Sequence, residues 1–243
     1  MRICITGTTS QGKSTLIDDF LTEWTTYTTP EKTYRDKLKN KWGIKTTKDT
    51  QWDILNSIVD ETQKYDSEDR VVFDRGPLDN LACSMWAYSK NIKGIDDKFI
   101  EKSMAIVRES LKLIDIIFYV PLTRASSTLD HRTEKFKKNE KKGLVSDDYR
   151  VEIDNILKAI KRDWDTNPES KFFDTHDKPA VIEVFGEPLE RIQIMKYYLD
   201  VDGDAIDDTG ILSAEELNEI EDVKSQFGIS DSTTQALKNP KGY

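Results

Sequence analysis

The chain has 243 residues, of which 37% are hydrophobic and 33% are charged, and its formal net charge is −9 at pH 7. This composition is typical of a folded protein with a well-solvated surface, and no apolar run approaches the ~20 residues that a membrane-spanning helix requires. The N-terminus enters an expected core strand rather than a signal peptide, so we expect a cytoplasmic protein without a membrane partner. The two cysteines, Cys4 and Cys83, favour buried thiols in a reducing compartment over a disulfide framework or a metal site.

The first predicted elements are a strand at residues 2–6 (RICIT), a glycine-rich turn at residues 7–15 (GTTSQGKST) and a helix that begins with LIDDFL. The turn has the spacing G-x-x-x-x-G-K-[ST] of the P-loop. In this motif, backbone N–H groups at a helix N-terminus cradle phosphates, the lysine reaches the β- and γ-phosphates, and the serine binds Mg²⁺. The motif therefore predicts a site for ATP and Mg²⁺ that is formed by Gly7, Thr8, Thr9, Ser10, Gln11, Gly12, Lys13, Ser14 and Thr15.

Further along the chain, short apolar strands alternate with helical patterns. The expected strands are residues 70–74, 115–120 and 181–185, with a weaker candidate at 24–29; the expected helices are residues 49–65, 77–90, 97–114, 147–164 and 187–199. Such alternation indicates a parallel sheet that is covered on both faces. We therefore predict an α/β fold of the P-loop NTPase type, a three-layer sandwich around a central parallel five-stranded sheet.

The stretch RVVFDRGPLDN (70–80) places Asp74 and Arg75 where an apolar strand ends and a helix begins. Ligands of parallel sheets bind at the carboxyl ends of the strands, so both side chains are expected at the same cleft as the P-loop. Asp74 could orient or deprotonate an attacking hydroxyl, or hold Mg²⁺, and Arg75 could bind a transferring phosphoryl group. The alternatives are that Asp74 caps the helix and that Arg75 is a surface charge.

GTTSQGKST together with FDRGPLDNLA resembles the nucleoside and nucleotide kinase group of P-loop proteins, such as deoxyribonucleoside and thymidylate kinases. It is also similar to the small-kinase ATPase domains that include the nicotinamide riboside kinase part of NadR-type proteins. Two shorter segments match that second set, DDYRVEID (147–154) and the turn GEPLER (186–191). The resemblance covers residues 1–199.

The resemblance implies a role for each matching residue. Asp74 would be the base or the magnesium-shell carboxylate, with Ser14 as the other metal ligand, and Arg75 would bind phosphate. Gln51 lies where nucleoside kinases often place a base-reading glutamine, although a solvent-facing glutamine fits equally well. Trp42, Trp52 and Trp86 could stack on an acceptor, or could simply belong to the core.

Residues 122–146 follow the third clear strand, contain few apolar residues and are rich in charge, which predicts a lid that closes over the phosphates and excludes water. Within this lid, residues 131–142 hold six Lys or Arg against two Glu. The lysine-rich insertion 135–142 is larger than closure over one nucleotide requires, so DNA also stays possible as the acceptor. Several arginines are candidate phosphate contacts, with solvated surface positions as the alternative: Arg124 and Arg191 for the nucleotide, Arg132 in catalysis, and Arg150 for the substrate.

The negative charge is concentrated at the other end of the chain. Residues 200–222 contain ten acidic residues and no Lys or Arg, so the rest of the chain is close to neutral. Residues 200–211 look like a calcium loop but lack its glycine at position six and its glutamate at position twelve. We expect residues 1–199 to form the kinase domain and residues 200–243 to form an acidic, partly disordered tail.

The sequence therefore predicts an enzyme, an ATP-dependent phosphotransferase that acts on a hydroxyl or phosphate of a nucleoside- or nucleotide-like acceptor. One variant is a DNA-modifying kinase for a hydroxymethylated pyrimidine within DNA, which the basic lid would accommodate. A regulatory P-loop ATPase without a small acceptor is the alternative from another class.

Overall fold

The computed structural model describes residues 1–31, 46–65, 69–123, 146–167 and 179–206. These residues form an α/β domain whose strands are β1 (Arg2–Thr6), β2 (Val71–Asp74), β3 (Ile116–Tyr119) and β4 (Ala180–Glu183). The helices are α1 (Lys13–Glu23), α3 (Lys48–Thr62), α4 (Pro77–Ser89), α5 (Asp97–Leu111), α8 (Asp147–Thr166) and α9 (Pro188–Lys196). Most of the predicted lid and tail, including Arg124 and Arg132, lies outside the described residues, and so does the candidate stacking residue Trp42.

The sheet is parallel throughout, and its strand order is β2-β1-β3-β4. The described sheet therefore has four strands, and the predicted fifth strand at residues 24–29 is wrong. That segment contributes one parallel bridge, in which the N–H of Thr28 donates to the carbonyl of Arg70 over 2.9 Å. Its aromatic residues do not alternate as a strand requires, because Trp24 and Tyr27 both pack on Phe20 after the turn that closes α1.

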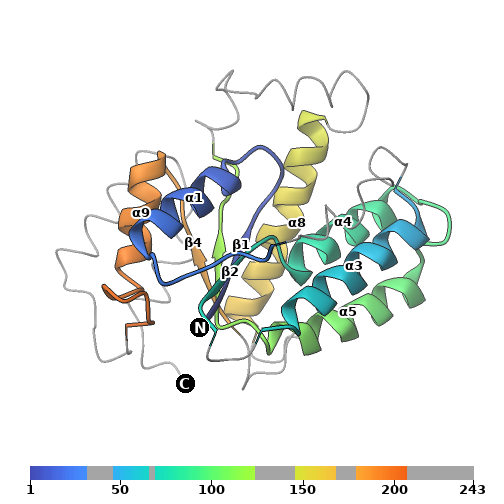
Figure 1. The fold of residues 1–243 in the computed structure, drawn as a ribbon. Helices are drawn as coiled ribbons and strands as arrows, with labels where there is room; N and C mark the ends of the chain where they lie inside the picture. The colour runs from blue at the N-terminus through green and yellow to red at the C-terminus, as the bar shows by residue number, and fades with distance from the viewer. Residues whose placement is uncertain (32–45, 66–68, 124–145, 168–178, 207–243) are drawn as a thin grey trace.

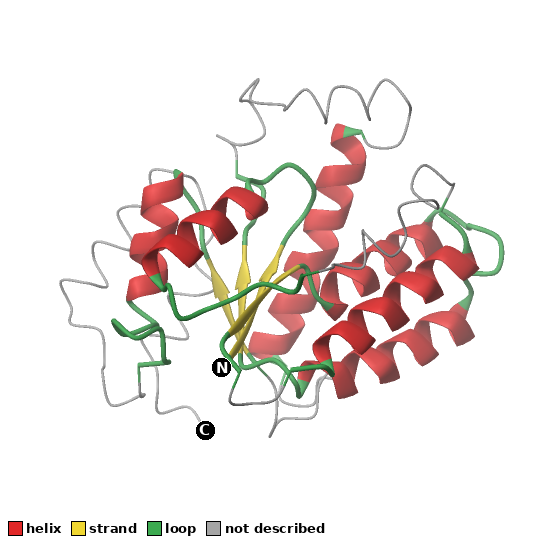
Figure 2. Ribbon diagram, viewed as in Figure 1, coloured by secondary structure: helices red, strands yellow, loops and turns green. Residues whose placement is uncertain are grey.

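Helices cover both faces of the sheet, with α1 and α9 on one side and α8, α4, α3 and α5 on the other (Figures 1 and 2). Alternate residues of the central strands divide between the two layers. Ile3 and Ile5 of β1 belong to the cluster beneath α1 and α9, whereas Cys4 belongs to the cluster beneath α4, α5 and α8. Both faces of β1 are thus buried, so a ligand can reach this strand only at its carboxyl end, where the P-loop begins.

Local signals explain where the helices begin. The side chains of Asp96 and Ser146 accept from the backbone N–H groups of Phe99 and Tyr149 at the starts of α5 and α8, and Pro77 and Pro188 begin α4 and α9. In the described part of the chain, no helix has both the length and the apolar character needed to cross a membrane.

Residues 200–206, which the sequence analysis assigned to the tail, pack against the domain. The indole N–H of Trp24 donates to the carbonyl of Asp200 over 2.8 Å, and the hydroxyl of Tyr27 donates to the carbonyl of Gly203 over 2.7 Å. Arg70 forms an ion pair with Asp204 over 2.6 Å. These contacts give two core aromatic residues their polar partners, so the turn acts as part of the domain.

We therefore predict different outcomes for two truncations. A chain that ends at residue 206 should unfold cooperatively at nearly the temperature of the full chain. A chain that ends at residue 199 leaves the polar atoms of Trp24 and Tyr27 without their acceptors, which should cost about 2–3 kcal/mol of unfolding free energy. Thermal denaturation followed by circular dichroism measures both, and equal melting temperatures for the two truncated chains would contradict the prediction.

Candidate active site

The P-loop connects the carboxyl end of β1 to the first turn of α1, as the motif predicts. Three of its residues have positive φ angles: Gly7 (146°), Ser10 (59°) and Gly12 (76°). A Cβ at Gly7 would lie 2.5 Å from the carbonyl oxygen of Val120, just beyond β3, so position 7 accepts no side chain without moving that strand's end. The loop is therefore tightly fitted between β1 and β3.

Five consecutive backbone N–H groups of the loop, those of residues 8–12, donate to no other residue that the structure describes. Side chains in the same loop are also without partners in the described part: the hydroxyls of Thr8 and Thr9, and both amide atoms of Gln11, are buried and unbonded. Thr8 and Gln11 are buried, where unpaired polar groups are costly, so this concentration of unpaired donors indicates a site for an acceptor-rich ligand.

The N-terminus of α1 lies at the same loop and also bears on which ligand the loop binds. The first turn of the helix, which is fully described, carries no acidic residue, and no side chain caps it. Lys13 is the first helical residue, is buried, and donates from Nζ to the carbonyl of Thr8 over 2.6 Å. Ser14 and Thr15 are exposed on the same turn. The positive end of the helix dipole and a lysine thus meet at the loop, which favours an anion.

Arginines from three different segments hold the carbonyl side of the loop. Arg75 donates to the carbonyl of Gly7 over 3.3 Å, Arg150 to that of Thr9 over 3.1 Å, and Arg191 to that of Gln11 over 2.6 Å. Burial lowers the pKa of Arg191, while the nearby carboxylates of Glu187, Asp19 and Glu190 oppose that shift. The structure thus brings three of the predicted arginines to the P-loop, where they contact its backbone.

Asp74 ends β2 and is half-buried. It pairs in register with Ile5, which lies two residues before Gly7 on the neighbouring strand. Arg75 follows with a φ of 77°, unusual for a residue with a side chain. Asp74, Arg75 and the P-loop therefore lie at one edge of the sheet, as the sequence analysis predicted.

Sequence reasoning missed Asp79. This residue is 3% exposed, and its carboxylate accepts from the N–H of Gly7 over 3.2 Å and from Arg75 over 3.0 Å. It also accepts from the N–H of Gly76 over 3.0 Å, which is the helix-capping arrangement of α4. An acid two residues after the proline at a helix start is a capping signal, so that part of its role was recognisable.

Gln51 lies in a buried polar cluster between α3 and α4 with Asn80 and Ser84. Asn80 Nδ2 lies 3.2 Å from both the backbone carbonyl and the side-chain Oε1 of Gln51, and the Ser84 hydroxyl lies 3.3 Å from the same Oε1. The backbone carbonyl can only accept, which fixes the orientation of the Asn80 amide and in turn that of Gln51. The carbonyl oxygen of Asn80 is buried and unbonded in the described structure.

The described tryptophans have structural partners. Trp52 packs against Phe99 with ring centroids 5.8 Å apart, and Trp86 packs edge-on against Tyr149 at 4.7 Å. The indole N–H of Trp86 also donates to Glu152 on α8 over 2.5 Å. These contacts join helices within the layer that contains α4.

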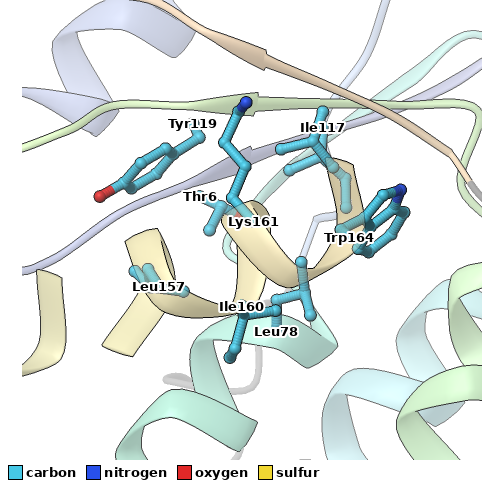
Figure 3. Close-up of a pocket in the computed structure, with 9 residues that line it drawn as sticks. Thr6, Leu78, Ile117, Tyr119, Leu157, Ile160, Lys161 and Trp164 are labelled. Carbon is cyan, nitrogen blue, oxygen red and sulfur yellow. The ribbon is translucent and has the colours of Figure 1, made fainter. Parts of the chain in front are cut away.

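A small pocket lies between the sheet and α8 (Figure 3). Its walls are mostly apolar, and it has room for no more than about one water molecule. Figure 3 shows the side chain of Lys161 extending from α8 toward the sheet; its ammonium pairs with Asp165 over 2.5 Å and lies 3.8 Å from Glu183. The pocket is therefore a packing gap in the core and not a second ligand site.

Comparisons with solved structures show where this fold occurs. A thymidylate kinase from Candida albicans is similar over 85% of this chain and 95% of its own, with 12% identity and a TM-score of 0.54. A deoxyadenosine kinase from M. mycoides, with the products dCMP and dCDP bound, is similar over 81% of this chain and 98% of its own, with 16% identity and a TM-score of 0.50. The NadR protein in complex with NR covers 94% of this chain and 51% of its own, with 14% identity and a TM-score of 0.46.

No curated protein matches the chain by sequence. A family match does exist: residues 2–141 match the AAA_28 family, described as an AAA domain. This region contains β1, the P-loop, α1, β2 and β3 and so carries Lys13, Asp74 and Arg75, whereas Arg150 and Arg191 lie beyond it. Because the match spans more than half of the chain, the protein belongs to this AAA domain family, and its fold is that of the P-loop nucleoside and nucleotide kinase group.

Proposed function

We propose that the protein is a kinase that moves the γ-phosphoryl group of Mg-ATP to a hydroxyl or phosphate of a nucleoside- or nucleotide-like acceptor. The observation that carries this proposal is the run of five unbonded N–H groups at residues 8–12, which opens at the N-terminus of α1 beside Lys13. Such an array matches the oxygen atoms of a polyphosphate. The fold shared with thymidylate kinase and deoxyadenosine kinase supports a nucleoside or nucleotide as the acceptor.

The residues at the site also fit a magnesium ion. Mg²⁺ prefers oxygen ligands, and the site offers the exposed hydroxyl of Ser14 and the carboxylate of Asp74 at the neighbouring strand end. When bound together with ATP, the ion neutralises charge on the phosphate oxygens.

The chain itself has three tasks in this reaction. Lys13 exchanges the carbonyl of Thr8 for phosphate oxygens, which places its charge where the transferring group carries negative charge. Asp74 accepts the proton of an attacking hydroxyl, or serves the magnesium shell where the acceptor group is a phosphate. The arginines hold the carbonyls of the loop, so that its N–H groups face the ligand.

The acceptor is proposed to lie beside Gln51. The oxygen of its side-chain amide already faces Asn80 and Ser84, so its remaining contact is the donor Nε2, which would bind an acceptor atom on a base. A chain of contacts links this cluster to the P-loop, because Asn80 directly follows Asp79 and Asp79 binds the N–H of Gly7. Trp52 and Trp86 already pack against other helices, so we assign them a structural role in the helical layer.

DNA is the second candidate acceptor, and the basic composition of residues 131–142 favours it. The test is a screen with γ-³²P-labelled ATP against nucleosides, nucleotides and oligonucleotides, some of which carry hydroxymethylated pyrimidines. Label on a free nucleoside or nucleotide supports the main proposal, and label on oligonucleotides alone supports the DNA variant. ATP hydrolysis without transfer to any of them would favour the regulatory ATPase.

Replacing Lys13 with Ala tests the P-loop assignment. The change removes the cation that faces the β- and γ-phosphates, so phosphoryl transfer should fall at least about a hundredfold while the melting temperature changes little. Lys98→Ala, at an exposed position on α5, is the matched control and should keep full activity. Initial rates with labelled ATP provide the measurement, and normal turnover in the Lys13 variant would exclude this site.

Replacing Asp74 with Asn separates two roles. A base acts only on the acceptor's proton, so kcat should fall about a hundred- to ten-thousandfold while ATP affinity stays within about threefold of the original. Asp60→Asn, exposed on α3, is the control for removal of a carboxylate. If ATP affinity in magnesium falls together with kcat, Asp74 acts chiefly in the magnesium shell.

A further inference from the structure

Asp79 occupies an unusual position in this domain, because one buried carboxylate binds groups from two separate strand ends. At the end of β1, its carboxylate accepts hydrogen bonds from the hydroxyl of Thr6 over 3.1 Å and from the N–H of Gly7 over 3.2 Å. From the segment after β2 it accepts the N–H of Gly76 and a guanidinium N–H of Arg75, each over 3.0 Å. Its four donors therefore fix the start of the P-loop relative to the segment that follows Asp74.

The contacts enclose Gly7 from both sides of its backbone. Asp79 accepts from the N–H of Gly7, while Arg75, paired to the same carboxylate, donates to the carbonyl of Gly7 over 3.3 Å. The side chains of Arg75 and Asp79 are only 11% and 3% exposed, so water competes little for these bonds. A shift of this ion pair would shift the first peptide of the loop.

We propose that Asp79 is a positioning residue that sets the P-loop for triphosphate binding through Gly7 and Arg75. The inference rests on the proposed function and deepens it, because it names the group that holds the five N–H donors in register with the phosphates. Without the carboxylate, the loop samples other conformations. The apparent affinity for the triphosphate then falls in proportion to the fraction of molecules that keep the binding conformation.

Asp115 provides a control at the opposite edge of the sheet. Its carboxylate accepts from the N–H of Arg2 over 2.6 Å and lies 3.7 Å from the guanidinium of the same residue. Asp115 thus also binds a backbone N–H and an arginine of a neighbouring segment, but it does so at the amino ends of β1 and β3, away from the P-loop. Loss of the Asp115 carboxylate should lower stability without changing the P-loop.

The test measures binding of a fluorescent ATP analogue with magnesium to the full chain, well below the melting temperature of each variant. Asp79→Asn should bind about tenfold or more weakly, whereas Asp115→Asn should bind within about threefold of the original protein even if it melts earlier. An unchanged affinity for Asp79→Asn, or an equal loss in both variants, would overturn the inference. Lys13→Ala serves as the reference, because analogue binding that does not depend on Lys13 would instead overturn the proposed function.

A pair of substitutions at Thr6 keeps the test decisive if Asp79→Asn fails to fold. Thr6→Val preserves the shape of the side chain but removes its hydrogen bond to Asp79, whereas Thr6→Ser keeps the hydroxyl. Affinity for the analogue should fall in the valine variant and return in the serine variant. Equal affinities in the two variants would show that the carboxylate network does not set the loop.

Discussion

The bonds between three arginines and the carbonyls of the P-loop are the constraint on which the rest of the site depends. They engage Gly7, Thr9 and Gln11, that is, every second residue of the loop. Hydrogen bonds from a charged donor contribute about 1.5–3 kcal/mol each, so together they can fix a loop that has little secondary structure. The arginines come from the segment after β2, from α8 and from α9, so the loop takes its shape only when both helical layers are assembled.

Where β1 and β3 end, the chain turns, and at one N–H group of each turn there is a need for an acceptor. Two carboxylates meet it from inside helices: Asp79 on α4 accepts from the loop after β1, and Asp154 on α8 accepts from Leu122 after β3. Each carboxylate is buried with a cation beside it. Arg75 is only 11% exposed, so removing the Asp79 carboxylate should cost about 3–5 kcal/mol, whereas Lys158 beside Asp154 is 45% exposed and can turn to water. The helices therefore fix the edge of the sheet where the candidate site lies.

Sequence reasoning predicts most of this fold because its strongest signals are local. The spacing of residues 7–14 fixes strand, loop and helix together, and Pro77 and Asp96 mark helix starts. The strand prediction for residues 24–29 fails because these β-branched and aromatic residues have strand propensity, but Trp24 and Tyr27 instead pack into the core. Asp79 is missed as a site residue because its partner Gly7 lies 72 residues away, and only the folded chain brings the two together.

The preference of the site for an anion arises from local geometry rather than from the charge of the whole chain, which is −9. The acidic residues that create this net charge are concentrated in residues 200–222, away from the P-loop in sequence. At the loop, guanidinium groups pair with the carbonyls and offset their partial negative charge, so the unbonded N–H groups and the helix dipole dominate the field on the opposite side. An acidic protein can therefore present a strongly positive surface to one ligand, because the field close to a site is set by the dipoles and charges within a few ångströms of it.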